Sequence, residues 1–449
     1  MKKLFVFQLT FIFTLFLGLN ALAQEESADM YENEDSRAEL QNFRYNDQRG
    51  LNVFEAPKDD TPYRGFGLRI GGDFALQYQG ISQSSNFAGD TLLELGSNFN
   101  LPTANLNIDA QLYDGVRLHL RTYLSSRHHE EAWVKGGYIR IDKLDFIKED
   151  FLSGFMDMAF IKVGMDEINY GDVHFRRSDN ARTIFNPFVG NYIMDAFTTE
   201  PFLEVNVMHE SGILGVVGAS NGRLNQNVVQ NNDEGITFYG KLGYDKQMND
   251  DLRLRFTGSF YTSSADQGTY PNPTGRNRQR DYLYAGDRSG ARYYGIMESN
   301  QGGGSDFDPR FSPGWKGLTA FQVNPFVKFK GLEFFGVFEM TSDNDTSGGS
   351  FTQLGAELLY RFGGNEQFYV GGRYNSVSGD FTDQSNTDMS QTRINAGAGW
   401  FITRNMLAKI EYVTHSYDGS LSPEGAPLNQ SRFDGATWDG IVLEAAISF

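Results

Sequence analysis

The sequence contains no cysteine in 449 residues. Disulfides, thiolate metal sites and a lipid-anchored cysteine are therefore excluded, and the fold must be held by backbone pairing and packing. Long apolar runs are also scarce, because the one stretch that approaches the roughly 18 apolar residues of a membrane helix lies within residues 1–23. Basic residues number 39 against 57 acidic ones, for a formal net charge of −18. Nucleic acid is therefore not an expected partner.

Residues 1–23 have the pattern of a cleaved secretory signal peptide. Lys2 and Lys3 precede an apolar stretch from Leu4 to Leu19, and Ala21-Leu22-Ala23 ends the segment. The mature chain is then expected to be 24–449. Export without a helical span leaves the periplasm, the outer membrane or the medium as its destination.

A two-residue period dominates the rest of the chain. The last nine residues place apolar side chains at 441, 443, 445, 447 and 449, and residues 106–112 and 116–122 alternate on either side of an Asp114-Gly115 turn. This second pattern predicts a hairpin. Its other face carries Arg117, His119 and Arg121, which a soluble core could bury only at a large desolvation cost. The apolar face and the charged face of this hairpin are both accommodated in a wall that separates lipid from water.

Counting such segments gives about 16 strands, and the connections between them alternate in length. Short turns such as Asp114-Gly115 and Lys330-Gly331 alternate with longer loops rich in Gly, Asn, Ser and Asp. We therefore predict an all-β protein, a transmembrane antiparallel β-barrel over residues 65–449 with short periplasmic turns and long extracellular loops. An even number of strands would place both termini in the periplasm.

Residues 24–64 are polar and acidic, with little periodic apolar content. We predict a flexible periplasmic N-terminal arm. A short helix around Ser36–Phe43 that plugs or caps the lumen is the alternative.

Charged residues on the polar faces of the predicted strands are expected to line the lumen and set its electric field. The candidates are Arg69, Asp73, Arg117, Arg121, Lys241, Arg253 and Arg255.

The segment 169–192 is the most distinctive one, because it concentrates charge between aromatic residues. Folded into the barrel, it would form a constriction in which the arginines favour anions and the aspartates oppose them. The other interpretation is an external loop that Arg–Asp pairs hold compact. The candidate residues are His174, Arg176, Arg177, Asp179 and Arg182.

The signal peptide, the terminal Phe449, the strand end Lys162–Asp172 and the loop 169–192 together resemble porin-like outer-membrane proteins of Bacteroidota. A looser likeness links them to the phosphate-selective porin O/P group. In architecture the likeness spans 66–449, whereas the similarity in the residues themselves is confined to about 161–200. The resemblance implies a β-barrel with a pore-type role and assigns no binding residue.

A second arginine cluster, at 276, 278, 280, 288 and 292, is interleaved with tyrosines in the longest loop. It would either grip an anionic saccharide or lie solvated beside local aspartates. The six histidines have no metal-site spacing, and no nucleophile elbow is evident. We therefore predict no metal, no cofactor and no catalytic residue, so the chain is not expected to be an enzyme.

These patterns predict an outer-membrane channel of a Gram-negative bacterium for passive diffusion of small hydrophilic solutes or ions. Its expected partners are outer-membrane lipid, lipopolysaccharide, these solutes and further copies of itself in a homotrimer. The alternative is a non-conducting receptor or a secretion or assembly accessory with the same wall. An outer-membrane lipid hydrolase and a secreted soluble β-protein are two further rivals.

Overall fold

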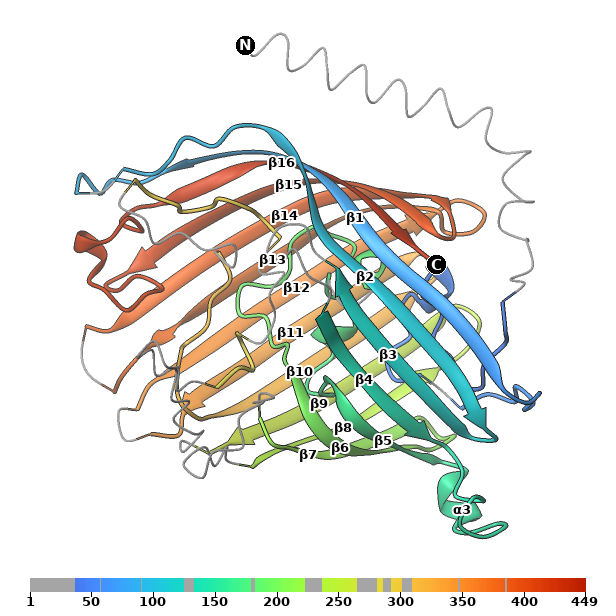
Figure 1. Cartoon of the computed structure of the whole chain (residues 1–449). Helices are drawn as coiled ribbons and strands as arrows, with labels where there is room; N and C mark the ends of the chain where they lie inside the picture. The colour runs from blue at the N-terminus through green and yellow to red at the C-terminus, as the bar shows by residue number, and fades with distance from the viewer. Residues whose placement is uncertain are drawn as a thin grey trace.

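The computed structural model describes residues 37–56, 58–89, 91–124, 133–178, 182–222, 236–264, 281–285, 292–300, 309–345, 348–383 and 386–449, without the side chains of 101, 102 and 133. Within these residues sixteen antiparallel strands pair with their neighbours in chain order, and the last pairs with the first. Figure 1 shows the resulting closed barrel. The prediction of an all-β transmembrane barrel of about 16 strands is confirmed.

The strands are β1 (Gly67–Ser84), β2 (Asn98–Tyr113), β3 (Val116–Leu124), β4 (Trp133–Ile141), β5 (Ala159–Glu167), β6 (Thr199–Met208), β7 (Ile213–Ser220), β8 (Thr237–Gln247), β9 (Leu252–Ser263), β10 (Leu318–Phe329), β11 (Leu332–Asp343), β12 (Ser350–Phe362), β13 (Phe368–Asp380), β14 (Asp388–Thr403), β15 (Met406–Gly419) and β16 (Thr437–Ser448). The helical elements of the described residues are short: α3 (Ser153–Met156) and the 3-10 turns η1 (Gln48–Gly50), η2 (Val173–Phe175), η3 (Thr183–Phe185) and η4 (Leu428–Gln430). In this part of the chain no helix is long and apolar enough to cross a membrane.

The outward side chains of the strands are mainly apolar, and most of the inward ones are polar. On β12, Leu354 and Leu358 are 49% and 53% exposed, whereas Gln353 and Glu357 are buried. This order is the reverse of a soluble protein's, and it suits a wall with hydrocarbon outside and polar groups inside.

The pairing of β1 with β16 closes the barrel. Phe74 lies opposite Ile447 and Tyr78 opposite Leu443, so the apolar outer faces meet in register. Closure leaves no strand edge with unpaired backbone groups, which lipid could not hydrogen-bond. The predicted terminal strand therefore forms the seam.

Connections at one end of the barrel are short, and those at the other end are longer. We call the first end the short-turn rim; its connections are 114–115, 142–158, 209–212, 248–251, 330–331, 363–367 and 404–405. The connection 142–158, which contains α3, is the exception to the predicted pattern of short turns on this rim.

The described part of the N-terminal arm is packed into the mouth of the short-turn rim. Gln41 donates to Asp114 at 3.0 Å, the Gln48 N–H donates to the Arg404 carbonyl at 2.9 Å, and Asn52 donates to Glu333 at 2.8 Å. Lys58 donates to the Asp142 carbonyl at 3.0 Å. The arm therefore contacts the wall at several points around the barrel.

The expectation of a flexible arm is thus wrong for residues 37–56. The segment enters the lumen, as the alternative supposed, but residues 37–43 form turns and bends rather than a helix. Its fixed position comes from buried contacts to residues far away in the sequence, which local periodicity does not reveal. Residues 1–36, including the predicted signal peptide, lie outside the described residues.

Candidate functional site

The long loop between β5 and β6 lies inside the barrel. Its described residues from 168 to 198 are buried, apart from a half-buried Arg182. Wall amides satisfy its backbone: Asn324 accepts from the Asp172 N–H at 2.8 Å, and Asn375 accepts from the Ile193 N–H at 2.6 Å. Because a buried backbone group needs a partner, these amides allow the loop to cross the lumen. The loop is therefore an internal part of the barrel.

A charged cluster joins this loop to the arm and to two strands. The Asp172 carboxylate accepts from Arg255 and from Lys241, each at 2.8 Å, and Arg255 also lies 2.8 Å from Glu55 of the arm. Burial alone would raise the pKa of Asp172, but Arg255 and Lys241 lower it to about 2. The same two cations outweigh burial at Glu55 and hold its pKa well below the usual range. Both carboxylates therefore stay ionised at neutral pH.

The arginines of the predicted constriction are engaged in ion pairs. Arg176 lies 2.7 Å from Glu333, Arg177 lies 2.6 Å from Asp195, and Arg182 pairs with Glu167. Arg176 and Arg177 are 4% and 2% exposed, so they face packed protein rather than an open path. Their pairing agrees with a compact loop, although the loop is internal and not external.

His174 is also buried in this loop. Burial lowers its pKa to about 3, with Lys241 and Arg182 adding to the effect of burial and Glu167 opposing it. The imidazole is therefore neutral at neutral pH. Asp179, the fifth candidate, lies outside the described residues.

The seven candidate lumen residues all turn toward the interior, where most of them hold the inserted segments. Lys241 and Arg255 bind Glu55 and Asp172, and Arg253 donates to the Asn52 carbonyl at 2.9 Å. The remaining contacts join Arg69 to the rings of Phe43 and Tyr45, Asp73 to Thr183, Arg117 to the Asn42 carbonyl and Arg121 to Asp166. All of them except Arg121, whose partner Asp166 lies on β5, therefore brace the arm or the loop.

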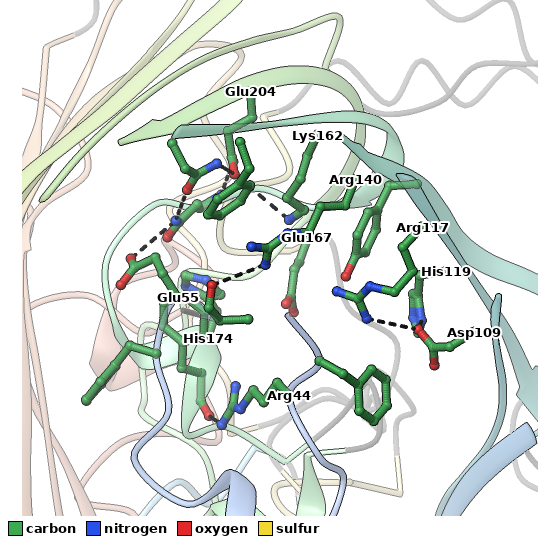
Figure 2. A pocket seen from close by; sticks show the side chains of 18 of the residues that line it. Arg44, Glu55, Asp109, Arg117, His119, Arg140, Lys162, Glu167, His174 and Glu204 are labelled. Carbon is green, nitrogen blue, oxygen red and sulfur yellow. Dashed lines mark hydrogen bonds and ion pairs between the residues drawn. The ribbon is translucent and has the colours of Figure 1, made fainter. Parts of the chain in front are cut away.

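A cavity remains between the arm, the loop and strands β2 to β6. About 100 Å³ of it admits the centres of water-sized molecules, and the empty space is about 810 Å³ when the open mouth is counted. Figure 2 shows charged side chains arranged around it, with Arg44 from the arm facing Arg140 from β4 across the open space. The cationic side chains of its lining are Arg44, Arg117, Arg121, Arg140, Lys162 and Arg182, and the carboxylates are Glu55, Asp109, Glu167 and Glu204. The lining thus carries six positive and four negative groups, which leaves it positive by two.

Lys162 of β5 is a weakly paired cation in this cavity. Its ammonium lies 3.9 Å from Glu204 and 4.5 Å from the centre of the Tyr138 ring, and its side chain is 16% exposed. By contrast, Arg140 makes two bonds of 2.9 Å to Asp142 and stacks on Phe160 at 3.8 Å. A solute anion would therefore compete with a weaker partner at Lys162 than at Arg140.

The cavity is lined mainly by charged and polar groups. Its carboxylates are paired with cations, and the described residues include no group of three or more side chains that could hold a metal ion. Such a lining can orient and attract small charged solutes through the field of its fixed groups.

The sequence prediction named only part of this lining. It included Arg117, Arg121, His174 and Arg182, whereas Arg140 and Lys162 were missed although they follow the same inward alternation on β4 and β5. That alternation could have identified them. Arg44 and Glu55 of the arm have no periodic signal, so only the folded chain reveals them.

The second arginine cluster is mostly outside the described residues, since 276, 278, 280 and 288 are not placed. Arg292 is fully buried, pairs with Glu444 of β16 and donates to Thr103 at 2.9 Å. It therefore lies in the lumen, and neither a solvated position nor an external saccharide site applies to it.

No family model and no curated protein sequence matches this chain. Among solved structures, OmpT of Vibrio cholerae matches with a TM-score of 0.50 at 9% identity, over 87% of this chain and 100% of that one. A trimer form of the same protein matches with a TM-score of 0.50 at 9% identity, over 86% and 100%. The outer-membrane channel DcaP of Acinetobacter baumannii matches with a TM-score of 0.50 at 11% identity, over 87% and 99%. The chain therefore has the barrel fold of these outer-membrane proteins.

Proposed function

We propose that this chain is a porin-like channel in the outer membrane of a Gram-negative bacterium, through which small hydrophilic solutes or ions diffuse passively. The observation that carries the proposal is the charged, open-mouthed cavity between the arm, the loop and strands β2 to β6, inside a closed barrel of sixteen strands. Barrels of 16 to 18 strands are wide enough for an aqueous path. The arm and the described residues of the loop 168–198 narrow this path, and the space that remains lies along β2 to β6.

The field of the cavity favours anions over cations of the same size. Six cationic and four carboxylate side chains line it, but Arg121 and Arg140 are paired with Asp166 and Asp142 just behind the lining. The preference therefore depends on weakly paired cations such as Lys162, whose ammonium lies 3.9 Å from Glu204. The acidic balance of the whole chain, −18, does not decide this preference, because selectivity depends on the charges along the path.

The membrane setting follows from the sequence and the fold together. A signal peptide over residues 1–23 would direct export, and the short-turn rim would face the periplasm with both termini. Lipid and lipopolysaccharide would then surround the barrel. OmpT of Vibrio cholerae has a trimer form, and a homotrimer is our expectation here. The resemblance to porin-like proteins of Bacteroidota supports the same assignment.

A second candidate function is a non-conducting receptor or a secretion or assembly accessory. The favouring observation is the burial of arm residues such as Phe54 and Glu55, at 2% and 7% exposure, together with the loop 168–198 inside the same lumen. A barrel filled in this way could transmit binding at one rim to the other rim without passing solutes.

Single-channel recording in planar bilayers separates the two functions. The full mature chain is compared with a variant that lacks residues 24–56, and heat-modifiable gel migration verifies that both fold. Conductance steps from the full chain, with a reversal potential that indicates anion preference, are the expected result. Steps from the truncated chain alone would favour the closed receptor, and no steps from either would refute the channel.

A further inference from the structure

The connection between β4 and β5 differs from the other connections on the short-turn rim. We call residues 142–158 the rim loop. The other connections on this rim are shorter and consist mainly of polar residues and glycine. Figure 1 shows α3 of the rim loop beyond the ends of β4 and β5, outside the outline of the barrel.

The rim loop exposes large apolar side chains. Phe146, Ile147, Phe151, Leu152 and Phe155 are 53%, 61%, 39%, 54% and 43% exposed. A group of this size is unfavourable in water and marks a surface that contacts a partner or a membrane. On the other turns of this rim the exposed positions are mainly charged or amide side chains.

The backbone of the rim loop has two residues in the left-handed region and is hydrogen-bonded at its turn and at its base. Leu152 has φ of 55° and Asp150 has φ of 57°, a left-handed region that non-glycine residues rarely occupy. The carbonyl of Leu152 accepts from the N–H groups of Phe155 at 3.0 Å and Met156 at 2.9 Å. Lys58 of the arm donates to the carbonyls of Asp142 and Met156, which fixes the base of the loop. Backbone strain that is maintained beside exposed apolar groups points to a functional surface.

The apolar surface of the rim loop continues the lipid-facing surface of the barrel. Ile139 and Val163 face outward at 39% and 44% exposure, and the rung Ile141–Ile161 follows them at the edge of the rim. The rim loop begins directly after this rung. The same bilayer that covers the outer faces of β4 and β5 is therefore the nearest apolar phase.

We propose that the rim loop is an interfacial anchor that inserts these apolar side chains among the phospholipids of the leaflet next to the short-turn rim. Partial insertion of aromatic and aliphatic groups at the headgroup boundary is a known mode of membrane attachment. The loop carries five carboxylates, Asp142, Asp145, Glu149, Asp150 and Asp157, against Lys143 and Lys148. Apolar burial rather than attraction to anionic headgroups therefore drives the contact. The inference rests on the barrel lying in a bilayer and does not depend on conduction.

The absence of cysteine allows single nitroxide labels to measure the depth of the rim loop. Labels are attached to Phe151→Cys and Phe155→Cys in the full mature chain, reconstituted in vesicles of phosphatidylethanolamine and phosphatidylglycerol. Leu354→Cys on the outer face of β12 is the lipid reference, and Lys330→Cys on an exposed short turn is the water reference. The expected result is that oxygen, which partitions into lipid, relaxes the labels at 151 and 155 more than a water-soluble nickel chelate does. The label at position 354 should show the same order.

Two results would overturn the proposal. Labels at 151 and 155 that respond like the label at 330 would place the rim loop in water. Labels that are immobile and shielded from both reagents would place it against a protein, either a second copy or another partner. A water-like label at position 354 would show instead that the barrel itself is not in the bilayer, and conductance tests the channel separately.

Discussion

Replacing Glu55 with Gln should release the arm from the lumen while the barrel stays intact. The Glu55 carboxylate lies 2.8 Å from Arg255 and 3.1 Å from Lys241, and Asn169 donates to it at 3.3 Å. Removing one partner of a buried ion pair costs about 3–5 kcal/mol, because the remaining charge stays buried without compensation. Here Asp172 continues to pair with both cations, so we expect the lower end, about 3 kcal/mol.

Hydrogen–deuterium exchange measures this loss directly. Since about 1.4 kcal/mol is a factor of ten in an equilibrium, amide protection across residues 45–56 should fall roughly 100-fold in Glu55→Gln. Amides of β12 and the opposite wall should keep their protection, because their ladder is untouched. Glu39→Gln is the matched control, since its side chain is 50% exposed and lies 3.7 Å from an exposed Arg64. Equal protection of the arm in both variants would refute the assigned role of Glu55.

Three further outcomes follow from the same contacts. Acid should release the arm only well below the usual glutamate range. A carboxylate with a depressed pKa stabilises the folded state fully above its unfolded-state pKa and loses that contribution as the pH falls toward its folded-state pKa. Arm exchange recorded from pH 7 to pH 3 should therefore rise only at the acid end of that range. Lys162→Gln should shift the reversal potential in the direction of cation preference, whereas Lys330→Gln should leave it unchanged, since the Lys330 side chain is 64% exposed on a turn. The same reversal potential in both variants would argue that ions do not pass through the cavity. Arg177→Gln should destabilise the packed loop by about 3–5 kcal/mol with little change of ion preference, because Arg177 and Asp195 are buried against each other at 2.6 Å. Limited proteolysis measures the stability of the loop and reversal potentials measure the ion preference. A large change of selectivity would contradict the prediction.

The barrel wall was predictable because its signal is local. Alternation over 106–112 and 116–122 fixed the hairpin of β2 and β3, and the pattern of 441–449 fixed the closing strand. Each residue of such a strand faces lipid or lumen according to its position in a period of two. The long connection 142–158 broke the expected pattern of turns because nothing in strand periodicity limits the length of a loop.

The candidate site was predictable only in part, because it depends on contacts between distant segments. The loop 169–192 stood out by its composition, but the burial of Arg176 by Glu333 and of Arg177 by Asp195 could not be read from it. A sequence pattern gives the charges of a loop, whereas its effective charge depends on which partners the fold supplies.

The sequence by itself determined a transmembrane barrel, since apolar and polar residues that alternate along enough strands can be satisfied together only between lipid and a polar interior. The tertiary structure decided what fills that interior. Glu55 meets Arg255, and Arg292 meets Glu444, across separations that no local pattern encodes. Because buried charges must be paired, these contacts determine which charges are neutralised and which, such as Lys162, remain available to a solute.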